Sequence, residues 1–116
     1  MSSPAASPAG GASGAASFEV VTTAPGRFAA RGVLTFANAR RARSEGLHAL
    51  RTSSAPDLEI DCAGIERSDS AGLAVLLDWM AIMKQEGRPL CFDHLPPAIL
   101  AVAQIGGVDV MLQKCV

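Results

Sequence analysis

The sequence predicts an α/β fold, in which helices pack on a small mixed β-sheet of about four to five strands. From residue 58 onward, strand and helix patterns alternate along the chain, an order that produces right-handed crossovers between parallel strands. Before residue 58, two short apolar segments flank a turn, which adds an antiparallel hairpin. Residues 18–116 have the length of one domain with a single core and are too few for two.

Residues 1–17 are expected to form a disordered tail, because after the first Met they contain only Ala, Ser, Gly and Pro. A secretion signal needs a basic start and a continuous apolar core, and here two prolines and a Gly-Gly pair interrupt every apolar run. We therefore expect a cytoplasmic protein. In that compartment, the widely spaced cysteines Cys62, Cys91 and Cys115 are expected to be reduced thiols.

Charge and motif content argue against nucleic acid, cofactors, metals and catalysis. The 10 Lys and Arg residues stand against 11 Asp and Glu, so no basic excess is available to neutralise a phosphate backbone. No glycine-rich phosphate-binding motif occurs, so no nucleotide cofactor is expected. His48 stands alone, and Cys91 with His94 supplies only two candidate ligands, so no metal is expected. The sequence contains no recognisable arrangement of a nucleophilic side chain with a general base. It therefore predicts a protein that is not an enzyme.

The first half of the chain contains a hairpin and one helix. Residues 18–22 and 27–30 flank an Ala-Pro-Gly turn at residues 24–26 and are expected to pair as antiparallel strands. A helix is predicted from residue 36 to about 51. Its apolar stripe comprises Phe36, Ala39, Leu47 and Leu50.

The second half alternates between strands and helices. Residues 58–65 form a strand in which apolar and acidic side chains alternate. Residues 70–86 give the strongest helix signal, with a stop at Gly87. A strand at 89–92 follows, then a helix whose start is signalled by Pro96-Pro97 and whose body is residues 99–105, then a short strand at 108–112.

The helix at 70–86 is more apolar than a helix on one face of a sheet requires. Between Ala71 and Met83, every residue except Gly72 and Asp78 is apolar. At about 100° per residue, one broad side forms the natural core face. That side comprises Gly72, Leu73, Leu76, Trp79, Met80 and Met83.

The opposite side of this helix carries small or apolar residues where a solvated helix would carry Lys and Glu. Ser70, Ala74, Asp78, Ala81 and Gln85 form one stripe there. We expect a partner protein to bind this side through Ser70, Ala71, Ala74, Val75, Asp78, Ala81 and Ile82. Two alternatives remain, that another element of the same chain covers this side or that the protein associates with itself through it. A membrane span is excluded, because it needs about 20 apolar residues and Asp78 interrupts this run.

Residues 58–77 read LEIDCAGIERSDSAGLAVLL, and this segment resembles the STAS family, the domain shared by sulfate transporters and anti-sigma factor antagonists. In that family, a strand ending in Asp is followed by a short loop and by Asp-Ser/Thr-x-Gly-Leu, which opens the main helix. Those places are filled here by Asp61, Asp69, Ser70, Gly72 and Leu73. The similarity continues through residues 84–90 and 99–112 and so covers most of the chain.

The start of the helix also has a physical interpretation that does not depend on the family. Asp69 or Ser68 can cap the free N–H groups, and Gly72 permits close packing of the first turn. Ser70 lies at the positive end of the helix dipole, where a phosphate is tolerated but changes the surface charge by about two units. Ser70 is therefore a candidate contact or phosphorylation switch, and the alternative is an ordinary serine of the first turn.

Within the family, the sequence is most similar to the stand-alone STAS subunit of bacterial phospholipid ABC transporters. The short chain and the Asp-Ser-Ala-Gly-Leu-Ala-Val-Leu-Leu run carry this similarity. The resemblance implies an accessory subunit that binds the transporter's cytoplasmic ATPase and lies at the inner membrane through it, helping to maintain outer-membrane lipid asymmetry. The alternative is an anti-sigma factor antagonist that binds a serine kinase and is controlled by phosphorylation at Ser70.

Overall fold

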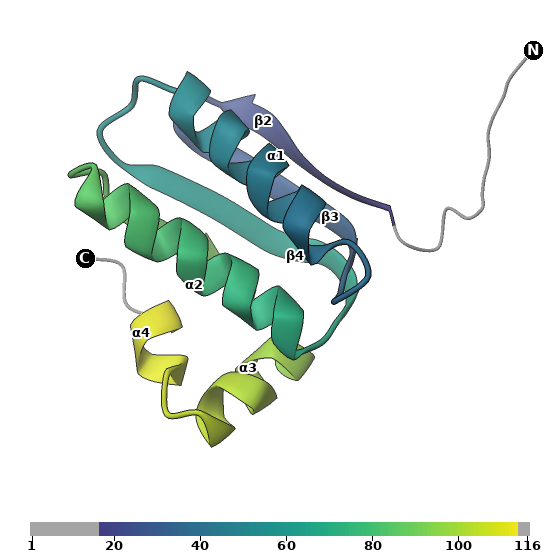
Figure 1. Ribbon diagram of the computed structural model, residues 1–116. Helices are drawn as coiled ribbons and strands as arrows, with labels where there is room; N and C mark the ends of the chain where they lie inside the picture. The colour runs from purple at the N-terminus through teal and green to yellow at the C-terminus, as the bar shows by residue number, and fades with distance from the viewer. Residues whose placement is uncertain (1–16, 114–116) are drawn as a thin grey trace, which may run out of the picture.

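Four strands form one sheet in the order β2-β3-β4-β5 (Figure 1). The structure is a computed structural model that describes residues 17–113, so the predicted tail, apart from Ser17, lies outside the described residues. The antiparallel hairpin consists of β2 (Phe18–Ala24) and β3 (Arg27–Leu34), and β4 (Leu58–Ser68) and β5 (Leu90–Asp93) continue the sheet in parallel. The sheet is mixed, and the predicted fold class is confirmed.

Side chains at alternate strand positions build the core. Phe28 on β3 is opposite Ile60 on β4, which is opposite Phe92 on β5, so a row of large apolar side chains crosses three strands. All three are buried. Glu59 and Asp61 occupy the intervening positions of β4 and point to the other sheet face, because successive side chains of a strand alternate.

The helices cover one face of the sheet (Figure 1). α1 (Ala39–Thr52) and α2 (Ser70–Gln85) lie side by side, and α3 (Pro97–Ile105) and α4 (Asp109–Gln113) lie beyond α2, on the side away from α1. α2 therefore occupies the middle of the helix layer and contacts α1, the sheet and α3. Within residues 17–113, no helix is both long enough and apolar enough to cross a membrane.

Trp79 joins α2 to α1 and to β2. Its indole Nε1 donates a hydrogen bond to the Arg43 carbonyl oxygen at 3.0 Å. The indole also stacks on the Phe18 ring, with the ring centroids 6.3 Å apart. Gly46 of α1 lies so close to the indole that a Cβ there would overlap the ring carbons. A glycine inside a helix lowers helix propensity, and at this position it makes room for the tryptophan.

The predicted start of the first helix is wrong by three residues. Residues 35–38 form a turn in which the Asn38 N–H donates to the Thr35 carbonyl oxygen at 3.1 Å, and α1 begins only at Ala39. Phe36 consequently does not belong to the apolar stripe of α1. Its side chain is 84% exposed.

The short strand predicted at residues 108–112 is also wrong, because residues 109–112 belong to the helix α4. Gly107, with φ of 73°, ends α3, and the Leu112 N–H then donates to the Val108 carbonyl oxygen at 3.2 Å. Leu112 is buried while Val110 and Met111 are exposed. A single helical turn buries one side chain in this way, whereas a strand buries alternate ones.

Candidate functional site

Asp69 caps α2 and also holds the loop before α1. Its Oδ1 accepts hydrogen bonds from the Ala71 and Gly72 N–H groups at 2.9 and 3.3 Å, and its Oδ2 accepts one from the Phe36 N–H at 3.1 Å. These N–H groups, that of Phe36 foremost, stabilise the carboxylate and hold the pKa of Asp69 below its usual value. The N-cap is therefore Asp69 and not Ser68. One carboxylate fixes two segments that are far apart in the sequence.

Gly72 and Leu73 place the first turn of α2 against the sheet. A Cβ at Gly72 would lie 2.7 Å from the Leu34 carbonyl oxygen and 3.3 Å from the Ser68 Cβ, so a larger residue would push α2 away from β3. Leu73 is buried in the core. The packing of this turn thus explains why the motif has glycine at position 72 and leucine at position 73.

The outward stripe of α2 lies where the sequence places it. Ser70, Ala74, Asp78, Ala81 and Gln85 are all exposed. The Asp78 carboxylate accepts a hydrogen bond from Arg43 Nε of α1 at 3.0 Å, in an ion pair whose two side chains are about half exposed. The rest of the stripe is uncharged, and its members other than Gln85 are small. Binding of a partner to this stripe stays a prediction.

The apolar border of the stripe differs from the sequence prediction. Val75, expected at the partner interface, is 3% exposed and belongs to the core, so its side chain is not available to a partner without unfolding. Ala71 and Ile82 are half-buried. The physical reason is that α1 and α3 contact α2 on either side and so cover more of it than the sheet alone would. The alternative that this chain covers its own helix is therefore correct for Val75, while binding of a partner to Ala71 and Ile82 stays a prediction.

The remaining face of α2 agrees with the prediction. The predicted core residues Gly72, Leu73, Leu76, Trp79 and Met83 are buried, and Met80 is half-buried against the same cluster. This helix contains many apolar residues because α1, α3 and the sheet surround it on three sides. The outward stripe is left exposed.

Asp61, the acidic residue at the strand position of the motif, lies on the sheet face away from the helices and contacts His94. Its Oδ1 accepts a hydrogen bond from the Ala63 N–H at 2.9 Å and lies 3.0 Å from His94 Nδ1. The Ala63 N–H and then His94 lower the pKa of Asp61. His94 has a positive φ of 53°, which is uncommon for a residue other than glycine. Sequence reasoning missed this pair, because the two residues are brought together only by the pairing of β4 with β5.

Within residues 17–113, no group of His, Cys, Asp and Glu is arranged to hold a metal ion. Cys62 is a free, buried thiol on β4, and burial raises its pKa to about 12, which leaves it unreactive. Cys91 is disulfide-bonded, so the expectation of a reduced thiol is wrong at that position. Cys115 lies outside the described residues.

Comparisons with known proteins match this architecture. The family model described as "Mlab, STAS domain" matches residues 20–113. A comparison with curated proteins finds no match.

Two solved structures have a similar fold. The anti-sigma factor antagonist SpoIIAA in its unphosphorylated form aligns with a TM-score of 0.63 and 17% identity, over 84% of this chain and 86% of that chain. RsbS of Moorella thermoacetica, in a variant in which a serine is replaced by glutamate, aligns with a TM-score of 0.57 and 16% identity, over 82% of this chain and 84% of that chain. At such identities, the two structures establish the fold.

Proposed function

Since the chain belongs to the STAS domain family, we propose that it is a non-enzymatic accessory subunit that binds the cytoplasmic ATPase of a phospholipid ABC transporter. The matching family description and the Asp-Ser-Ala-Gly-Leu run at the start of α2 support this assignment. In this role the protein acts in the cytoplasm, at the inner membrane through its partner, and the transporter maintains outer-membrane lipid asymmetry.

The observation that carries the proposal is the outward stripe of α2. Ser70, Ala74 and Ala81 are exposed and carry short side chains, on a helix whose opposite face is packed in the core. Short side chains let a partner helix or loop approach the α2 backbone closely, and little side-chain entropy is lost on binding. Asp78 lies within the stripe, and its ion pair with Arg43 of α1 supplies polar groups for orientation.

A second candidate, an anti-sigma factor antagonist that binds a serine kinase, is favoured by one observation. Ser70 is exposed in the first turn of α2, directly after the N-cap, and its hydroxyl is accessible for phosphorylation. A phosphate there would lie at the positive end of the helix dipole, so α2 would remain folded while its surface gained negative charge.

Purification of the full chain from its host distinguishes the two candidates. We expect a membrane-bound ATPase to copurify with the wild-type protein and to be lost from Ala74→Arg, because a long cation would replace a methyl group at a close contact. Thr23→Arg is the matched control, since Thr23 is exposed on β2 and lies outside the stripe. Copurification of a serine kinase in place of the ATPase would establish the second candidate.

The same preparation tests whether Ser70 lies in the interface. Ser70→Glu adds a carboxylate at a helix N-terminus, so the fold should be retained while the affinity for the ATPase falls. If the affinity of Ser70→Glu equals that of the wild type, Ser70 does not contact the partner.

A further inference from the structure

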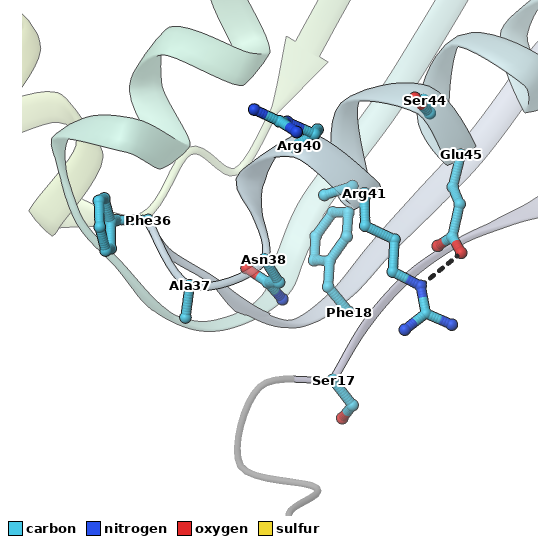
Figure 2. A pocket seen from close by; sticks show the side chains of 10 residues that line it. Ser17, Phe18, Phe36, Ala37, Asn38, Arg40, Arg41, Ser44 and Glu45 are labelled. Atoms are coloured by element: carbon cyan, nitrogen blue, oxygen red, sulfur yellow. Dashed lines mark hydrogen bonds and ion pairs between the residues drawn. The ribbon is translucent and has the colours of Figure 1, made fainter.

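The start of α1 carries a second surface, which adjoins the N-terminal end of the outward stripe of α2, because the Phe36 N–H is bound by Asp69, the residue before Ser70. A hollow of about 950 Å³ lies between the β3–α1 loop, the first turns of α1 and the start of β2, and we call it the α1 hollow (Figure 2). Its lining includes the aromatic residues Phe18 and Phe36 and the charged residues Arg40, Arg41 and Glu45. Figure 2 shows Phe36 at one end of the hollow and Glu45 at the other.

The charged groups of the α1 hollow leave a positive surplus. Arg41 Nε pairs with Glu45 Oε2 at 3.2 Å, so that carboxylate is already matched. Arg40 is exposed and forms no ion pair with any residue in the range 17–113. The first turn of α1 contains no acidic residue, and the positive end of the helix dipole therefore adds to the potential.

Phe36 is an apolar contact that the fold holds in place. Phe36 is 84% exposed, so most of its apolar surface is in contact with water. Its backbone N–H is bound by Asp69, which is itself bound to the first turn of α2. An exposed aromatic side chain on a restrained backbone loses little entropy when it binds, as interface anchors do.

We propose that the α1 hollow docks an acidic segment of a partner protein, with a carboxylate on Arg40 and an apolar side chain against Phe36. This inference deepens the proposed function and rests on it, because the α1 hollow adjoins the partner surface of α2. The peptide experiment below can succeed or fail whether or not an ATPase copurifies with the chain. Charge complementarity selects the occupant. Residues 1–16 of this chain contain no carboxylate side chain and cannot supply it. A flat lipid surface would contact only the rim of a concave hollow.

A display selection of random short peptides against the full chain tests the proposal. We expect the selected peptides to combine Asp or Glu with apolar residues, and their affinity, measured by fluorescence anisotropy, to fall as salt rises. Arg40→Glu should weaken a selected peptide by about tenfold or more, since it turns an attraction into a repulsion. Lys84→Glu is the matched control, because Lys84 is an exposed cation of α2 outside the hollow and the net charge changes equally.

Phe36→Ala separates the two parts of the contact. It should weaken the same peptide while leaving the salt dependence unchanged, because only the apolar contact is removed. The proposal is overturned if the selected peptides show no acidic excess, or if Arg40→Glu and Lys84→Glu weaken binding equally. It is overturned as well if inorganic phosphate or anionic lipid vesicles compete for Arg40 as strongly as the peptide, since the hollow would then bind anions alone.

Discussion

Several residues of this protein satisfy two structural requirements at once, and Asp69 is the clearest. Its Oδ1 caps α2, and its Oδ2 accepts a hydrogen bond from the Phe36 N–H in the loop before α1. Trp79 likewise fills the core and satisfies its indole N–H on the Arg43 carbonyl. Substitutions at such positions affect two elements together, so their effects should exceed those of single contacts.

Asp69→Asn should reduce stability in a pH-dependent way. The asparagine keeps one acceptor oxygen for the α2 cap but loses the second oxygen that binds the Phe36 N–H. Because the folded pKa of Asp69 is depressed, its contribution is full above the unfolded pKa of about 3.9 and disappears as pH falls through the folded value. Urea unfolding of both proteins from neutral to acidic pH measures this difference. A gap in unfolding free energy that stays constant with pH would contradict the prediction.

Gly46→Ala tests the packing of Trp79. The added methyl group overlaps the indole, and overpacking of this kind costs about 1–3 kcal/mol, more than the roughly 1 kcal/mol that alanine gains in helix propensity. We expect a net loss of stability in thermal or urea unfolding. Gly106→Ala is the control, since a Cβ there meets its nearest atom at 3.8 Å and φ is -83°. Equal effects of the two substitutions would show that Trp79 moves aside without cost.

At the scale of elements, α2 shows what a periodic pattern predicts well and what it does not. The pattern identifies the core face, because side chains that repeat every three or four residues must share a face. The width of the buried arc depends on how many neighbours surround the helix, and that is a tertiary property. For this reason the sequence correctly indicates that Ala74 is exposed and incorrectly indicates the same for Val75.

Two adjacent positions of α2 should therefore respond in opposite ways to the same substitution. Ala74→Arg places a cation on the exposed stripe and should change the free energy of unfolding by less than about 0.5 kcal/mol. Val75→Arg buries a charge without a partner and should cost about 3–5 kcal/mol, a large part of the stability of a small domain. Circular-dichroism melting of each isolated variant measures this. If Ala74→Arg melts at as low a temperature as Val75→Arg, the side chain at position 74 is buried in the core and the stripe is not exposed.

The elements that the sequence predicts correctly are those with long or repeated signals, namely the hairpin, the strand that contains Asp61 and helix α2. The short C-terminal helix is missed, because residues 108–112 are too few for periodicity to separate a helix from a strand. The α1 hollow and the contact between Asp61 and His94 are missed for a different reason. They bring together residues from separate elements, and only the packing of α1 on the sheet and the pairing of β4 with β5 create them.

At the scale of the whole molecule, two loops at the same end of the fold are joined by one side chain. Arg88 lies between α2 and β5, and its guanidinium donates hydrogen bonds to the carbonyl oxygens of Leu50, Ser53 and Ala55. Those carbonyls belong to the end of α1 and the segment that leads to β4. The guanidinium thereby closes the end of α1 and couples the first half of the chain to the second.

Arg88→Lys should consequently destabilise the fold although the charge is kept. A guanidinium has a fork of donors that spans several carbonyls, whereas one ammonium group cannot reach all three, and half-buried carbonyls left without a donor cost about 1–3 kcal/mol. Arg51→Lys is the matched control, because Arg51 pairs with Glu86 at the surface and exposed ion pairs contribute about 1 kcal/mol or less. Urea unfolding should show a lower midpoint for Arg88→Lys than for Arg51→Lys with an unchanged slope. Equal midpoints would mean that water replaces the guanidinium at these carbonyls and that the two halves are held together by the apolar core alone.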